Sequence, residues 1–155
     1  MASNTSAAGE SNAELQAKQA PAVAAPVVRL LRLEGLALAA ISAVLYARIG
    51  SSWWLFAALW LVPDLSMLGY LVSPCWGARC YNAIHSTITP ITLALAALLL
   101  HTAGPLPYAL IWLNHIGVDR LLGYGLKYPA GFGWTHLGRQ GKRRGESTLA
   151  PSSPA

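Results

Sequence analysis

Charged side chains are scarce in this chain of 155 residues. Asp, Glu, Lys and Arg together make up 11% of the sequence, whereas hydrophobic residues make up 54%. An ordinary soluble domain carries about 25% charged residues, because its outer surface must be polar. The composition therefore excludes a typical soluble enzyme and predicts a membrane protein.

Cysteine is also scarce, which limits the redox functions of the chain. Cys75 and Cys80 are the two cysteines, and their spacing differs from that of a CxxC redox pair. We expect both to be free structural thiols, because the loop that contains them is assigned below to a reducing compartment.

Long apolar segments are abundant. Four of them cover approximately residues 30–49, 52–72, 81–100 and 106–126, and Gly and Pro residues separate them. Each is near the roughly 20 residues that a helix needs to cross a hydrocarbon core. The runs LALAAISAVLY and ITLALAALLL have no polar face, which disfavours a soluble helical bundle. The predicted fold is all-α, a four-helix transmembrane bundle with disordered N- and C-terminal tails.

The domain organisation follows from the same pattern. Residues 1–28 are rich in Ala, Ser, Pro and Asn and are predicted to be a disordered tail. Residues 29–138 form the predicted four-span membrane domain. Residues 139–155 begin with a cluster of basic residues and are predicted to be a basic disordered tail.

Lys and Arg are unevenly divided between the two sides of the predicted bundle. One side receives Arg29, Arg32, Arg79, Lys127 and the basic tail, and the other receives Arg48. Both termini are therefore expected to be cytoplasmic, in a multi-pass membrane protein. We expect the basic residues behind the net charge of +5 to contact anionic lipid headgroups of the bilayer rather than nucleic acid. The sequence leaves open whether the protein forms a homo-oligomer.

Five ionisable side chains lie inside the apolar segments, namely Glu34, Asp64, His85, His115 and Asp119. A carboxylate near the middle of a membrane helix costs roughly 2.5 to 3.5 kcal/mol, so it generally faces a partner, a cavity or an ion. With a rise of about 1.5 Å per residue, all five fall in the cytoplasmic half, His85 about one turn inside the third helix. We expect them to share one site, with Pro63 opening room beside Asp64.

These residue types are suited to a divalent metal. His115 and Asp119 lie one helical turn apart, and Asp64 and His85 would complete a nitrogen and oxygen shell for zinc or manganese. Such an ion would support metal-dependent hydrolysis of a lipid or phosphate-containing substrate, with Glu34 as a catalytic proton acceptor.

Two other interpretations stay open. The polar groups could pair with one another and hold together a non-enzymatic bundle, or they could form the pathway of a small ion- or proton-coupled transporter. Beyond the fourth segment the sequence GYGLKYPAGFGWTHLG is rich in Gly and aromatic residues. Arg120, Lys127 and His136 in and near it are candidate contacts for an anion or a lipid headgroup.

Several sequence blocks carry a family resemblance. LRLEG, PDLSMLGY, YNAIH, WLNHIGVDRLLGYGLKYP and GFGWTHLG resemble the signature blocks of a bacterial four-span membrane family known as domain of unknown function 4260. The resemblance covers approximately residues 30–138 and implies a compact four-span membrane protein, which we expect in the bacterial inner (plasma) membrane. It implies no activity and no catalytic residue.

A more distant similarity is to membrane-bound metal-dependent hydrolases, in which Pro-Asp, His-Ser and His-x3-Asp elements recur. Here Pro63-Asp64, His85-Ser86 and His115 to Asp119 stand in that order. The additional histidines around the middle element are absent from this chain, and Asp64 is not directly followed by an acidic partner. The similarity favours a metal site.

Overall fold

The computed structural model describes residues 25–129, 134, 135 and 137–139, and this part of the chain is almost entirely helical. Its helices are α2 (Ala25–Arg48), α3 (Trp53–Leu59), the 3-10 helix η1 (Val62–Leu71), α4 (Pro74–His85), α5 (Ile88–Leu99) and α6 (Leu106–Leu122). Two short strands, β1 (Trp134–Thr135) and β2 (Gly138–Arg139), pair antiparallel. The predicted all-α fold is confirmed.

Three helical segments are long and apolar enough to cross a membrane. They are Ala25–Arg48, Trp53–Leu71 and Pro74–Leu99. Their side chains are mostly exposed, including large apolar ones such as Leu36, Leu68 and Leu98. A helix that exposes this much apolar surface is stable where lipid, rather than water, covers it.

Two helices begin earlier in the sequence than predicted. α2 begins at Ala25, inside the predicted tail; the remaining predicted tail residues, 1–24 and 140–155, lie outside the described part of the chain. The third segment begins at Pro74 rather than near residue 81. The side chain of Ser73 caps this helix by accepting a hydrogen bond from the backbone N–H of Trp76 at 3.2 Å, and Pro74 occupies the first helical position.

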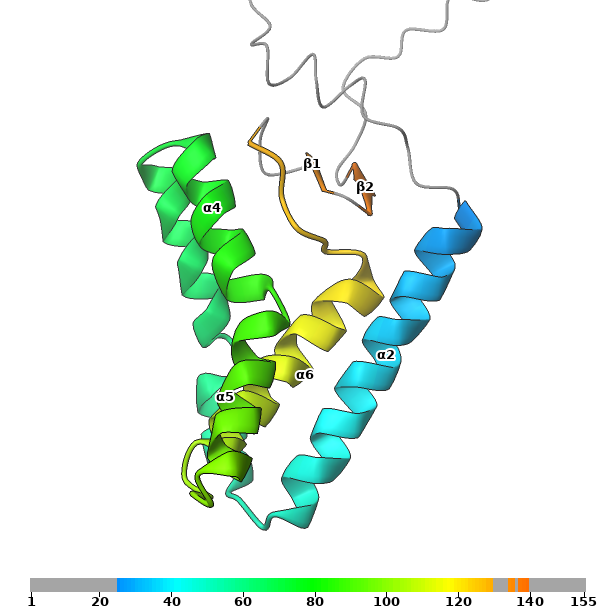
Figure 1. Cartoon of the computed structure of the whole chain (residues 1–155). Helices are drawn as coiled ribbons and strands as arrows, with labels where there is room; N and C mark the ends of the chain where they lie inside the picture. Colours follow the sequence, from blue (N-terminus) through cyan, green and yellow to red (C-terminus); the bar gives the residue numbers. More distant parts are fainter. Residues whose placement is uncertain (1–24, 130–133, 136, 140–155) are drawn as a thin grey trace, which may run out of the picture.

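α6 is the central helix, and the other helices contact it or each other around it (Figure 1). Residues Leu113 to Gly117 in its middle are all buried. α2 packs along one side of α6, while η1 packs on α4. Figure 1 shows α2 and α4 diverging toward the end of the molecule at which α2 begins. We call the two units the α2–α6 pair and the η1–α4 hairpin.

The α2–α6 pair is packed so closely that backbone touches backbone. A Cβ atom added at Gly117 would lie 2.6 Å from the backbone nitrogen of Ala39, and one added at Gly35 would lie 2.7 Å from the nitrogen of Leu121. Small residues allow this approach, which is a common basis of helix association in membranes.

The η1–α4 hairpin is also closely packed. A Cβ atom added at Gly77 of α4 would overlap the ring of Tyr70 of η1. In a 3-10 helix side chains three residues apart lie on one face, so Asp64 and Met67 point in the same direction. Runs of 3-10 helix longer than four residues are uncommon, and this one covers ten residues around Asp64.

A short segment after α6, residues 123–129, lies over the end of that helix, and we call it the cap. It begins with Gly123, whose φ of 93° lies in the left-handed region that glycine favours. A Cβ atom added at Gly123 would lie 2.6 Å from Nη2 of Arg32. The backbone of Lys127 forms an antiparallel bridge with Thr135. The cap therefore lies near the beginning of α2, at the end of the bundle where α6 finishes.

Candidate functional site

Four ionisable side chains meet where the η1–α4 hairpin faces α6. Asp64, His85, His115 and Asp119 each offer one oxygen or nitrogen atom, and these atoms all lie within 4.8 Å of one another. Asp64 comes from η1, His85 from the last residue of α4, and the other two from α6. His85 and His115 are buried, and Asp64 and Asp119 are partly exposed.

The shortest contact in the group joins the two imidazole rings, with Nε2 of His85 3.2 Å from Nε2 of His115. Oδ1 of Asp64 lies 3.5 Å from each of these nitrogens. Oδ2 of Asp119 lies 3.6 Å from Nε2 of His85 and 3.8 Å from Nε2 of His115. All four atoms therefore point at one small volume.

The ring of His85 is oriented by the backbone of its own helix. Its Nδ1 lies 3.1 Å from the carbonyl oxygen of Tyr81, which can only accept a hydrogen bond, so Nδ1 carries a proton. In the neutral ring the lone pair is then on Nε2, the atom that faces the two carboxylates and His115. Histidine ligands of metals are commonly held in this way.

Tyr81 supports the group in a second way. Its hydroxyl donates a hydrogen bond to Oδ2 of Asp119 at 3.1 Å, and its ring stacks on that of His85 with centroids 3.7 Å apart. His115 packs edge-on against Trp60, whose indole N–H donates to Asn114. Within the described residues Nδ1 of His115 has no hydrogen-bond partner. Packing therefore orients this second ring.

A cavity of about 320 Å³ opens beside the four ionisable groups. Asp64, His115 and Asp119 contribute to its wall, and the remaining lining residues are Trp60, Met67, Tyr81 and Tyr124. A second, water-sized hollow of about 10 Å³ lies next to His85, Asp119 and Arg120. The group is thus accessible to a small molecule and to water.

The cap places a lysine beside two of the aromatic residues that line this cavity. Lys127 is 3% exposed, and its Nζ lies 5.2 Å from the ring centroid of Tyr81 and 5.6 Å from that of Tyr124. Burial lowers the pKa of Lys127, and the negative charge of Asp119 opposes that shift. Asn82 fixes the lysine backbone through two hydrogen bonds, donating to its carbonyl oxygen at 2.9 Å and accepting from its N–H at 2.7 Å.

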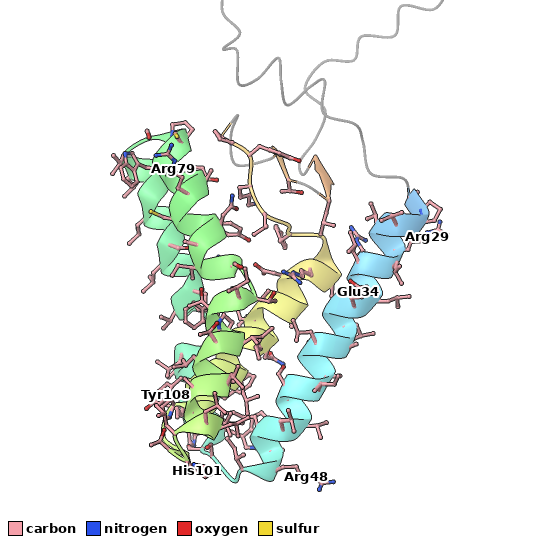
Figure 2. The ribbon with its side chains drawn as sticks, viewed as in Figure 1. Arg29, Glu34, Arg48, Arg79, His101 and Tyr108 are labelled. Carbon is pink, nitrogen blue, oxygen red and sulfur yellow. The ribbon has the colours of Figure 1, made fainter. Side chains whose placement is uncertain are left out.

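The other predicted site residues are placed differently. Glu34 lies on α2 with an exposed side chain and is not a member of the four-residue group (Figure 2). The structure therefore gives no support to Glu34 as the proton acceptor of this group. Arg120 lines the small hollow beside Asp119. His136 lies outside the described residues.

Sequence reasoning missed Tyr81 and Asn82. Neither is charged, so neither stands out in an apolar segment as a costly group. A signal for Tyr81 was available, because it precedes His85 by four residues and therefore shares its helix face. Nothing in the sequence pairs Asn82 with Lys127, since the two lie 45 residues apart.

The fold and the site define a class of protein: an all-α chain with helices suited to a membrane and a carboxylate and histidine group between them. The family model described as Domain of unknown function (DUF4260) matches residues 28–140, and the chain belongs to that family. No curated protein and no solved structure matches the chain.

Proposed function

We propose that this protein binds one divalent cation, zinc or manganese, through Asp64, His85, His115 and Asp119, and uses it to hydrolyse a lipid or phosphate-containing substrate. The observation that carries the proposal is the convergence of four ligand atoms from three helices within 4.8 Å. The donor set of two imidazoles and two carboxylates is one that both metals accept.

The distances within the group agree with this assignment. In a tetrahedral site with metal–ligand bonds of about 2.0–2.1 Å, neighbouring ligand atoms are about 3.3–3.4 Å apart. The two Nε2 atoms are 3.2 Å apart, and the four distances from Nε2 to a carboxylate oxygen run from 3.5 to 3.8 Å. A small contraction of the group would therefore provide a four-ligand site.

The electrostatics favour a cation as well. A proton on Nε2 of His115 could satisfy its contact with His85, but the lone pair of His85 would still face both carboxylates at 3.5 and 3.6 Å. Contacts between acceptors repel unless a positive charge lies between them. One divalent ion satisfies all four atoms at once.

The hydrolytic role is supported by the access that the cavity gives water and substrate to the metal site. A bound divalent ion acts as a Lewis acid and makes water more acidic. The side chain of Asp64 is 33% exposed and faces the cavity, so its second carboxylate oxygen is suited to accept a proton from attacking water. Asp119, whose side chain is 17% exposed, is held by Tyr81 and serves as a fixed ligand.

For the location we propose a bacterial inner membrane, with α6 as a fourth membrane segment and both termini in the cytoplasm. Arg29 and Arg79 lie at the end of the bundle where α2 begins, and Arg48 and His101 lie at the opposite end (Figure 2). The excess of Lys and Arg near the termini supports a cytoplasmic position for that end and a contact with anionic lipid headgroups.

The depth of the site differs from the sequence-based expectation. Because α4 begins at Pro74, His85 lies about 16 Å along the helix rather than one turn inside it. On this basis we propose that the metal lies near the middle of a hydrocarbon core about 30 Å thick. The breaks between α3 and η1 and between α4 and α5 flank this level, and interrupted helices often form binding sites at mid-membrane.

Elemental analysis of the purified protein tests the metal, and release of product from phosphate and carboxylate esters tests the hydrolysis. We expect stoichiometric zinc or manganese in the natural sequence and in a Cys75→Ser, Cys80→Ser variant, and loss of metal and activity in Asp119→Asn. Absence of stoichiometric metal after incubation with either ion would overturn the metal site. Metal without ester cleavage would overturn the hydrolase.

A further inference from the structure

We propose that the substrate of the metal site is a lipid and that one of its acyl chains occupies an apolar pocket beside that site. The inference rests on the proposed function and narrows its substrate class to molecules with a long hydrocarbon chain. The pocket has a volume of about 400 Å³ and shares no lining residue with the metal-site cavity. We call it the apolar pocket, and its wall consists of Val62, Pro63, Leu65, Ser66, Ile84 and Trp112.

η1 contributes to both the apolar pocket and the metal-site cavity. Its 3-10 conformation repeats about every three residues, so neighbouring residues point in different directions. Asp64 and Met67 share one direction and line the metal-site cavity. Pro63 and Leu65, on either side of Asp64 in the sequence, line the apolar pocket. One short helix therefore borders a polar cavity and an apolar one.

α4 and α6 bring the apolar pocket close to the two histidines. Ile84, which lines the pocket, directly precedes His85 in α4. Trp112, which also lines it, lies nearly one helical turn before His115 in α6. The indole N–H of Trp112 donates a hydrogen bond to the carbonyl oxygen of Ile84 at 2.8 Å, and this bond joins the two helices at the pocket. Each element that supplies a proposed metal ligand thus also supplies part of the pocket wall.

The chemistry of the wall favours hydrocarbon over water. None of the six lining residues is ionisable, and the indole N–H of Trp112 is already used in its bond to Ile84. The hydroxyl oxygen of Ser66 is buried. A water molecule in a cavity needs about two to four polar partners, and apolar cavities stay dry. The wall therefore fits a hydrocarbon chain.

The surroundings indicate that this chain belongs to a lipid. Val62 and Leu65 are 47% and 61% exposed, on a segment that is long and apolar enough to cross a membrane. In a bilayer, the acyl chains of lipids lie outside such side chains. An apolar cavity of about 150 Å³ can hold a benzene molecule, so about 400 Å³ has room for about a dozen chain carbons. The pocket is large enough for a long segment of one acyl chain.

The polar end of the same lipid fits the metal-site cavity. That cavity of about 320 Å³ is lined by Asp64, His115 and Asp119 together with aromatic side chains. A lipid with its chain in the apolar pocket would place its ester group at the proposed metal. A soluble phosphate ester has no such chain and would leave the pocket empty. An empty apolar pocket loses the contacts that its wall could make, so a lipid is the favoured substrate class.

Binding of two fatty acids to the manganese-loaded protein in lipid nanodiscs tests the inference. Dodecanoate and butyrate share a carboxylate that can ligate the metal, and dodecanoate adds a chain for the apolar pocket. Manganese broadens the NMR signal of a bound carboxyl group, so a titration gives both affinities. We expect Leu65→Trp, which narrows the pocket, to weaken dodecanoate binding about 5- to 30-fold, because displaced methylene groups lose contacts with the wall. Butyrate binding should not change.

Leu68→Trp is the matched control for Leu65→Trp. Leu68 lies on the same helix and is 60% exposed, close to the 61% of Leu65, but it does not line the pocket. Ser66→Phe narrows the pocket at a second position, so the test does not depend on the folding of one variant. Partition into the bilayer raises the apparent affinity of dodecanoate in every sample, and the comparison between variants therefore isolates the pocket.

Manganese content measured on the same samples separates this inference from the proposed function. Full manganese content with equal dodecanoate affinity in Leu65→Trp, Ser66→Phe and the natural sequence would overturn the acyl-chain pocket and leave the metal site intact. An equal loss of dodecanoate affinity in Leu68→Trp would also overturn it, because the loss would then not come from the pocket. If no sample held manganese or zinc, the proposed function would fail, and this inference with it.

Discussion

The two faces of α6 are held to the rest of the molecule by different means. Toward α2 the contact is made mainly by backbone and small residues, with Gly117 and Gly35 leaving no room for a Cβ atom, and by one hydrogen bond from the side chain of Asn114 to the carbonyl oxygen of Ala39. Toward the η1–α4 hairpin the contacts include polar side chains, among them His85 with His115 and Tyr81 with Asp119. The first interface is defined by shape and the second by chemistry.

This difference separates the stability of the bundle from the function that we propose. A contact between close-packed backbones depends on volume and is insensitive to metal or pH. A contact between two imidazoles and two carboxylates depends on what lies between them, because these groups repel or attract according to their charge. We therefore expect the α2–α6 pair to act as a scaffold and the hairpin interface to respond to the ion.

Of the changes considered, removal of the metal should destabilise the protein most, through the interface between α6 and the η1–α4 hairpin. A ligand at 100 times its Kd stabilises a protein by about 2.7 kcal/mol, so chelation should lower the unfolding temperature in detergent clearly. His85→Ala should lower it in the presence of zinc and abolish the response to the chelator. A chelator response that survives in His85→Ala would place the stabilising ion elsewhere.

A bulky residue in the α2–α6 pair should destabilise the protein by a similar or slightly smaller amount. It should do so without changing the metal content of the folded protein. Gly117→Val forces a side chain against the backbone of Ala39 and should cost about 1–3 kcal/mol of unfolding free energy. The folded fraction should keep its full metal content. Gly104→Val is the control, because nothing lies within 4 Å of a Cβ atom at that position.

The two interfaces of α6 differ in how much of them could be predicted from the sequence. Asp64, His85, His115 and Asp119 could be named in advance because a charged or ionisable group in an apolar segment is costly wherever it points. Gly35 and Gly117 could not be paired, since a glycine in a helix carries no signal of what approaches it. The helix start at Pro74 was predictable from the Ser-Pro pair, but the apolar pattern outweighed it.

Loss of the Tyr81 hydroxyl should have a moderate effect on metal affinity. Tyr81→Phe keeps the ring stacked on His85 and removes the hydrogen bond to Asp119. Loss of a hydrogen bond to a metal ligand typically lowers metal affinity by about 10- to 100-fold. Tyr46→Phe, which removes a hydroxyl bonded to the Ser52 carbonyl oxygen, is the matched control and should leave zinc affinity unchanged in a competition titration. Equal affinities for both variants would contradict the proposed support by Tyr81.

The smallest expected effect belongs to Trp112. Its indole N–H donates a hydrogen bond to the carbonyl oxygen of Ile84 at 2.8 Å and so ties α6 to the end of α4. Trp112→Phe should cost about 0.5–1.5 kcal/mol in unfolding free energy beyond the loss of packing. Metal affinity should fall less than in Tyr81→Phe. A larger fall would show that the Trp112 contact, rather than Tyr81, positions the ligands.

X-ray absorption spectroscopy of the zinc-loaded protein tests the proposed metal site most directly. The account predicts a first shell of nitrogen and oxygen atoms at about 2.0–2.1 Å, with the outer scattering of two imidazole rings. Both features should be lost in a His85→Ala, His115→Ala variant and kept in a Cys75→Ser, Cys80→Ser variant. A shell of sulfur at about 2.3 Å, or zinc without imidazole scattering, would contradict the account.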